Sequence, residues 1–411
     1  MITIVGARVF IGDRLVDTTV TIHGGLIHAV GGEPAETVID GAGATLLPGL
    51  IDCHTHLCAT ATPDIIAQMT GDSPTRAALH AARNARAHLD AGVTTVRDCG
   101  ALGGVAIELG RAIDDGLVEG ARVQAAGLVI TITGGHGHFL GREADGVDEV
   151  RKATRQAVKD GAGFIKVMST GGLLTPGVTA GRTAYTPDEL KVLVDEAHNA
   201  GLRVATHAIG NEGIKNALRA GVDSVEHGFY LDDEAIELLL AREDVYLVPT
   251  LAGVECALAH GDGLAPWLRA KSQAVVEDRA ASFRRAHAAG VRFAAGTDAG
   301  TPFNPHGGLP EEIALMAEIG LSPTEALLAA TRNAAANLGL ADRLGTIEVG
   351  KTADLVLVDG DPLADLGALR KVRQVIQNGV PSRSSDHAGQ RTRESAGRDD
   401  GCAVDQDLVH S

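Results

Sequence analysis

The chain has few aromatic residues, few cysteines and no excess of positive charge. Aromatic residues make up 3% of its 411 residues, so a hydrophobic core must be built mainly from Ala, Val, Leu and Ile. The five cysteines are odd in number and show no CxxC spacing, which favours a reducing compartment over a disulfide framework. With Lys+Arg 36 against Asp+Glu 53, the formal net charge is −17, and so acidic a surface repels nucleic acid and anionic lipid. We therefore expect a small-molecule substrate, with no nucleic acid and no membrane as partner.

Long apolar segments and targeting signals are also missing from the sequence. No apolar run reaches the roughly 18 residues that a membrane span needs. The first residues, MITIVGARVF, lack the basic start and apolar centre of a secretion signal. We expect a cytoplasmic protein that forms a homo-oligomer.

The pattern of apolar residues divides the chain into three parts. Residues 1–47 alternate apolar and polar positions between Gly-rich turns, which predicts a small antiparallel β unit. In residues 48–338, short apolar strands alternate with Ala-rich helical stretches such as TPDELKVLVDEAHNA, so the fold class is α/β. Eight such alternations predict a (β/α)8 TIM barrel. Residues 339–380 return to the β pattern and could complete the first sheet, and the polar residues 381–411 predict a disordered tail. The expected strands of the barrel are GLIDCHTHL, GVTTVRDCG, ARVQAAGLVIT, GFIKVMST, GLRVATHA, VDSVEHG, DVYLVPT and VRFAAGTDAG.

Side chains that can bind metal stand at the ends of these expected strands. In PGLIDCHTHL, His54 and His56 are two residues apart, so in a strand both point to the same face. Each candidate has an ordinary structural alternative: a satisfied core histidine, a helix cap for Asp298, or a lysine whose amine reaches the mouth of the barrel. Their joint position at strand ends, where barrel active sites form, favours a functional site. The others are Lys166, His207, His227 and Asp298, on expected strands four, five, six and eight.

Together these motifs resemble the amidohydrolase superfamily, in particular its binuclear metal branch. LLPGLIDCHTHL near the start and GTIEVGKTADLVLVD near the end resemble the family's small composite β-sandwich, here 1–47 plus 339–380, beside the hydrolase barrel. ITGGHGH, IKVMSTGG, ATHAIG, EHGFYL and GTDAG are most similar to the imidazolonepropionase-related group that includes Xaa-Pro dipeptidases, the prolidase-like enzymes.

The resemblance implies a centre of two divalent metal ions, with zinc as the expected metal. His54, His56 and Asp298 would hold one ion, and His207 and His227 the other. A free lysine ammonium has no lone pair for a metal, whereas an N6-carboxylated Lys166 would be an anionic bridge. Two ions can share a hydroxide that attacks a carbonyl. Asp298 would then take its proton and pass it to the leaving amine.

Candidate substrate contacts lie in the loops that follow the strands. The glycines of TGGHGHFLG would let His136 or His138 approach the metals, and His138 is slightly favoured. No GK[ST] follows this loop, so a phosphate-binding loop is not indicated. By resemblance, a histidine here and Tyr230 in EHGFYL would contact the substrate. Arg182 could clamp a carboxylate, or could be a solvated loop charge.

These features predict a metal-dependent hydrolase that cleaves an amide bond in dipeptides or N-acyl amino acids. A lactonase, carbamate hydrolase or phosphotriesterase could use the same centre. A ring-opening imidazolone hydrolase fits less well, because by resemblance it uses one metal and needs no lysine at position 166. A non-catalytic scaffold is an alternative of another class, but it should have lost a ligand, and here none is missing.

Overall fold

The computed structural model describes residues 1–382. The predicted disordered tail begins at residue 381, and all but its first two residues lie outside the described part. Within residues 1–382, no helix is both long and apolar enough to cross a membrane.

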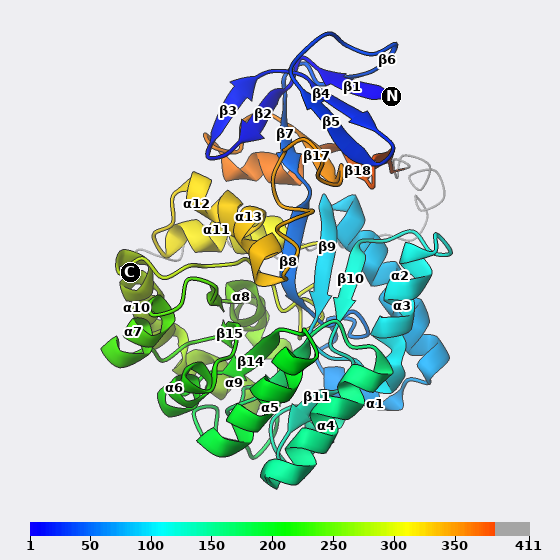
Figure 1. Cartoon of the computed structure of the whole chain (residues 1–411). Coiled ribbons are helices and arrows are strands. Elements are labelled where there is room, and N and C mark those ends of the chain that lie inside the picture. The colour runs from blue at the N-terminus through cyan, green and yellow to red at the C-terminus, as the bar shows by residue number, and fades with distance from the viewer. Residues whose placement is uncertain (383–411) are drawn as a thin grey trace.

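Strands from the two ends of the chain share a β region, which stands at the top of Figure 1. Strand β7 pairs antiparallel with β17, so residues 44–48 lie beside residues 355–359. Apolar side chains such as Ile4, Val20 and Leu355 form the core of this region. One sheet has the order β5-β4-β1-β6 and the other β19-β18-β17-β7-β2-β3. Their bounds are β1 (Ile2–Val5), β2 (Arg8–Ile11), β3 (Arg14–Asp17), β4 (Val20–His23), β5 (Leu26–Val30), β6 (Thr37–Asp40), β7 (Ala44–Pro48), β17 (Leu355–Asp359), β18 (Val372–Gln377) and β19 (Val380–Pro381).

The rest of the chain is an α/β fold built on parallel strands. The sheets have the orders β10-β9-β8 and β12-β11-β13-β14-β15-β16, and each adjacent pair is parallel. Buried residues run almost without interruption along most of these strands, as expected for a sheet covered on both faces. The bounds are β8 (Leu50–Thr55), β9 (Val93–Asp98), β10 (Arg122–Ala125), β11 (Val129–Thr131), β12 (Gly141–Glu143), β13 (Ile165–Met168), β14 (Val204–Ala208), β15 (Ser224–His227) and β16 (Tyr246–Val248).

Two of the expected barrel strands differ from the prediction. The third is split into β10 and β11, and Gly127 between them has φ +70°, outside the extended region. The eighth is not a regular strand. Its backbone makes only isolated bridges, Thr55 with Ala299 and Leu247 with Phe293, which place it between β8 and β16. Strand pairing among residues 1–382 therefore gives two parallel sheets and does not by itself show a closed barrel.

The helices begin where local sequence signals predict. Helix α2 follows Ser73, whose hydroxyl accepts a hydrogen bond from the Arg76 amide, and Pro74 occupies its first turn. Helix α5 opens with a capping box between Thr186 and Glu189. Their bounds are α1 (Ile65–Gly71), α2 (Pro74–Asp90), α3 (Val105–Asp114), α4 (Gly146–Asp160), α5 (Pro187–Asn199), α6 (Asn211–Ala220), α7 (Asp233–Leu240), α8 (Leu251–Ala259), α9 (Pro266–Ala274), α10 (Val276–Ala288), α11 (Leu309–Glu318), α12 (Pro323–Ala329) and α13 (Arg332–Asn337), with short 3-10 turns η1 (Leu102–Gly104), η2 (His138–Leu140), η3 (Gly261–Gly263) and η4 (Leu366–Arg370).

Candidate metal centre

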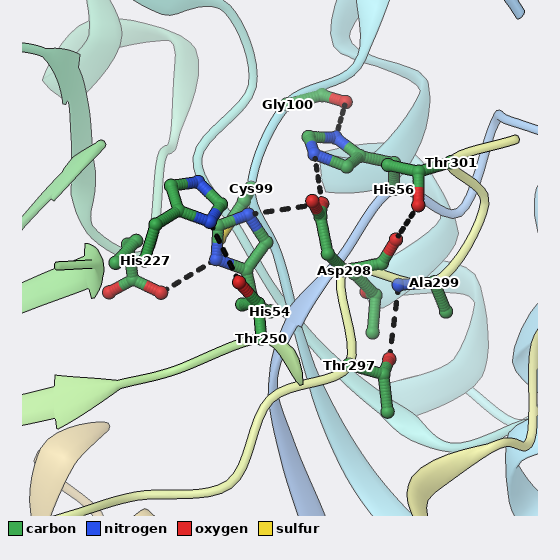
Figure 2. A network of polar contacts seen from close by, with 12 residues as sticks. His54, His56, Cys99, Gly100, His227, Thr250, Thr297, Asp298, Ala299 and Thr301 are labelled. Carbon is green, nitrogen blue, oxygen red and sulfur yellow. Dashed lines mark hydrogen bonds and ion pairs between the residues drawn. The ribbon is translucent and has the colours of Figure 1, made fainter. Parts of the chain in front are cut away.

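His54, His56 and Asp298 come together at the carboxyl end of β8. His54 Nε2 lies 3.5 Å from Asp298 Oδ1, and His56 Nε2 lies 3.2 Å from the same oxygen. One ligand atom from each residue lies within 4.8 Å of the other two. Figure 2 shows both imidazoles turned toward the Asp298 carboxylate. This arrangement is consistent with a metal centre of the kind that histidine and carboxylate ligands form.

The second pair of predicted ligands lies beside the first. The ring centroid of His227 is 5.1 Å from that of His54 and 4.4 Å from that of His207. His207 donates through Nε2 to the Gly171 carbonyl at 3.0 Å, so its Nδ1 is left for a ligand. All the predicted ligands, His54, His56, Lys166, His207, His227 and Asp298, line one pocket at the strand ends.

Lys166 on β13 is the unusual member of this set. Its side chain is buried, with 1% relative exposure. Its Nζ has no hydrogen-bond partner among the described residues. An unpaired ammonium in such a place is costly, because burial removes its hydration without replacement. The position therefore suits a lysine whose amine has been modified to an uncharged or anionic group.

Three of the four histidine ligands, His54, His207 and His227, are held in the neutral form that metal binding requires. The pKa of His56 is instead raised, because the opposing effect of burial is outweighed by its hydrogen bond to Asp298 and the charge of that carboxylate. Burial, together with the charge of Lys166, lowers the pKa of His54 to about 4. Burial likewise places the pKa of His207 and of His227 well below the ordinary value. Burial alone would raise the pKa of Asp298, but the neighbouring His54 and His56 outweigh it and hold that pKa below its usual range. Neutral imidazoles and an ionised carboxylate are the forms with lone pairs free for a cation.

Several side chains that orient these ligands were not anticipated from the sequence. Glu226 on β15 accepts a hydrogen bond from His54 Nδ1 at 2.7 Å, and its other oxygen accepts from Arg97 Nη2 at 2.7 Å. The Glu226 contact fixes the proton on Nδ1 of His54 and leaves Nε2 facing Asp298. On the other side, Thr250 Oγ1 lies 2.7 Å from His227 Nδ1. The available signal was a glutamate inside the expected strand VDSVEHG, but its partner His54 is 172 positions away.

The backbone at the centre is held in a sparsely populated conformation. His227, Thr250 and Asp298 have φ values of 71°, 49° and 59°, in the left-handed region that side chains other than glycine rarely adopt. The backbone at Asp298 is also held through the preceding residue, Thr297. The Asp52 carboxylate accepts hydrogen bonds from both the backbone N–H and the hydroxyl of Thr297. Such conformations persist only where surrounding contacts determine them, and they gather at functional sites.

The two candidate histidines of the loop after β11, His136 and His138, differ in their position relative to the pocket. His136 is buried in the pocket, with Nδ1 2.8 Å from Thr175 Oγ1 and its ring centroid 4.3 Å from that of His207. The slightly favoured residue, His138, is exposed and does not line the pocket. Of the two candidate histidines, His136 is therefore the one that lines the pocket.

Tyr230 and Arg182 also lie away from the pocket lining. Phe229, and not Tyr230, lines the pocket in the segment that follows β15. Tyr230 is half-buried on the outer side, near Asp278. Arg182 is exposed, and its backbone carbonyl accepts a hydrogen bond from the Gly171 amide. Neither Tyr230, the predicted substrate contact, nor Arg182, the predicted carboxylate clamp, lines the pocket.

The remaining pocket wall is almost entirely apolar. It comes from α1, the loops after β11, β13, β14 and β15, and helices α8 and α9. Its apolar residues are Ile65, Met69, Phe139, Leu140, Met168, Leu173, Leu174, Ile209, Phe229, Val254, Ala257, Leu268 and Pro302. The pocket thus combines a compact polar floor with an apolar chamber above it, a common form of small-molecule site.

Known proteins share this fold and much of this sequence. A model described as "Amidohydrolase family" matches residues 45–381. Ochratoxinase from Aspergillus niger is 33% identical over 361 residues, which covers 80% of this chain and 73% of that protein. Imidazolonepropionase from Salinispora tropica is 27% identical over 399 residues, covering 89% of this chain and 92% of that protein. A crystal structure of a Xaa-Pro dipeptidase superposes with a TM-score of 0.86 at 33% identity and covers 93% of this chain and 99% of that one. With the His-His-Asp cluster and the family match over most of its length, the chain belongs to the amidohydrolase family.

Proposed function

We propose that the protein hydrolyses an amide bond in dipeptides or N-acyl amino acids at a centre of two divalent ions. The observation that carries this proposal is the ligand set on one pocket floor, with the unpaired amine of Lys166 among the histidines. We further propose that the parallel strands close into a (β/α)8 barrel through the segment between β8 and β16.

The residues present fit a binuclear centre with zinc as the favoured metal. His54, His56 and Asp298 would hold one ion, and His207 and His227 the other, since imidazole and carboxylate suit zinc. Carbon dioxide added to the neutral amine of Lys166, with loss of one proton, would give an anionic carbamate that could serve as a further ligand. The bound ions would supply Lewis acidity and lower the pKa of water toward neutrality.

The protein's own groups would carry the proton and hold the substrate. Asp298 would accept the proton of the attacking water and deliver it to the leaving nitrogen, because its carboxylate faces the pocket and stays ionised. His136, buried beside His207, would donate a hydrogen bond to an oxygen of the substrate. The apolar wall would exclude bulk water from the reacting groups.

Related hydrolases support an amide rather than a lactone or phosphotriester. The most similar proteins include a Xaa-Pro dipeptidase and an ochratoxinase. A lactonase, carbamate hydrolase or phosphotriesterase could use the same centre. Turnover of lactone, carbamate and phosphotriester substrates beside an amide, on the same metal-loaded protein, would distinguish these activities. A non-catalytic scaffold is disfavoured because the ligand set is complete.

Elemental analysis of protein produced with zinc or manganese tests the proposal. We expect about two ions per chain. Lys166→Met keeps an unbranched apolar stem but cannot form a carbamate, so it should lose much of the metal and nearly all amide hydrolysis while remaining folded. Folded wild-type protein with metal content near zero would contradict the proposal, as would wild-type turnover in Lys166→Met.

A further inference from the structure

The pocket contains very few charged groups. Among the described residues that line it, Lys166 is the one cation and Asp298 the one carboxylate. Both are already engaged in the candidate metal centre. Four other buried acids lie near the centre and turn their oxygens elsewhere: Glu226 to Arg97 and His54, Asp52 to Thr297, Asp98 to the amides of Leu57 and Gly100, and Glu312 to the amides of Leu251 and Ala252.

Donors for a negatively charged or neutral oxygen are nevertheless present. His136 lines the pocket, and so do the hydroxyls of Ser272, Thr250 and Thr301. The Thr301 hydroxyl already donates to the Asp298 carbonyl and the Thr250 hydroxyl is paired with His227, so His136 and Ser272 are the donors that a carbonyl or carboxylate could use. The pocket therefore differs in what it offers to the two charges. An anion could accept hydrogen bonds from these donors, whereas an ammonium group would have no free carboxylate to pair with.

The lack of a free carboxylate in the pocket affects how a free dipeptide could bind. In a free dipeptide the α-amino nitrogen is two bonds from the scissile carbonyl carbon, about 2.5 Å away. Once that carbonyl reaches Asp298 and the histidines, the ammonium must lie inside the pocket too. It would be buried among apolar side chains and imidazoles, without a free acid to pair with. Burying an unpaired charge in this way opposes binding strongly.

We propose that the substrates are N-acyl amino acids or related amides whose acyl half is uncharged and apolar, and that free dipeptides are poor substrates. This inference rests on the proposed amide hydrolysis and narrows it to one substrate class. The side chains around the pocket, such as Phe139, Leu174 and Phe229, suit an aromatic or branched aliphatic acyl group.

A matched pair of substrates isolates the effect of the amine. Leucyl-phenylalanine and 4-methylpentanoyl-phenylalanine differ only in the replacement of the α-ammonium by hydrogen. On the zinc-loaded protein, kcat/KM should be about 10-fold higher for the desamino compound at pH 7 and about 100-fold higher at pH 6, because the pocket would accept the dipeptide only with its amine neutral, and with an amine pKa near ~8 this form is about one-tenth and one-hundredth of the dipeptide at these pH values. The difference should shrink as pH rises above the amine's pKa near ~8, where the dipeptide becomes neutral. Equal rates, or faster cleavage of leucyl-phenylalanine, would overturn the inference.

A substitution in the pocket wall offers the converse test. Leu174 is half-buried, so Leu174→Glu would place an acid beside the pocket at moderate cost, and Leu174→Gln is its uncharged control. The kcat/KM of leucyl-phenylalanine, divided by that of the desamino compound, should rise in Leu174→Glu and should not rise in Leu174→Gln. An equal response of both variants would count against the inference.

Equilibrium binding separates this inference from the proposed function. Calorimetry with 4-methylpentanoate and with leucine compares the two acyl products without requiring turnover. We expect tighter binding of 4-methylpentanoate. If neither amide is cleaved but this order holds, the proposed hydrolysis fails while the charge selectivity stands; tighter binding of leucine refutes the selectivity.

Discussion

Replacing Glu226 by glutamine should weaken metal binding although Glu226 itself is not a proposed ligand. One carboxylate oxygen accepts from His54 Nδ1, and the other accepts from Arg97 Nη2 and Ser224 Oγ at 2.7 and 2.6 Å. Glutamine has one acceptor oxygen and one NH2 group. If the glutamine oxygen faces Arg97, its NH2 group donates to His54 Nδ1. The imidazole proton of His54 must then move to Nε2, and Nε2 is the atom that would bind the metal. If its oxygen faces His54, the NH2 meets the donors of Arg97 and Ser224.

The size of the effect follows from this loss of orientation. Partners that orient a metal-bound histidine typically contribute 10–100-fold to metal affinity. Glu226→Gln should therefore raise the zinc Kd by about 10–100-fold, which corresponds to about 1.4–2.8 kcal/mol. The amide should fill the same volume, so the fold should persist, although Arg97 loses part of a fully buried ion pair.

Zinc affinity should be measured by competition with a chelator of known affinity, alongside thermal unfolding of the metal-free proteins. Ser224→Ala is the matched control, because it removes a hydrogen bond to the same carboxylate and leaves its charge and its contact with His54 in place. A folded Glu226→Gln protein with wild-type zinc affinity would refute the orienting role of Glu226.

Three further perturbations test other contacts. His136→Asn should lower kcat/KM by ~10²–10³-fold through loss of a substrate donor, while His138→Asn, a change at an exposed site, should have little effect; the opposite order in steady-state kinetics would reverse the assignment. Lys271 Nζ donates to the carbonyls of Thr175 and Val178 at 2.8 and 2.6 Å, so Lys271→Met should speed amide hydrogen exchange across residues 171–183, and unchanged exchange would contradict this contact. Burial raises the pKa of Glu312 to about 8, so the native state binds an extra proton between about pH 4.5 and 8 and its unfolding free energy falls as pH rises through that window. Glu312→Gln should flatten this slope, which is at most about 1.4 kcal/mol per pH unit, in denaturant titrations at several pH values.

The family and the candidate ligands could be recognised from sequence because they depend on local patterns. Period-two alternation and strand-end positions identified His54, His56, His207 and His227 as candidates, and the helical stretch TPDELKVLVDEAHNA contains α5. A parallel fold directs the carboxyl ends of its strands to one edge, so residues far apart in the chain could be expected at one site.

The orientation of individual side chains depended on tertiary contacts. The contact of Glu226 with His54, the inward turn of His136 rather than His138, and the outward position of Tyr230 each depend on which neighbour packs against which face. The irregular eighth segment and the split third strand likewise reflect pairing with other strands rather than local propensity. Sequence by itself therefore determined which chemistry is available, because spacing along one strand is a local property. Only the folded chain decided which groups face the substrate, because those contacts join segments that packing alone brings together.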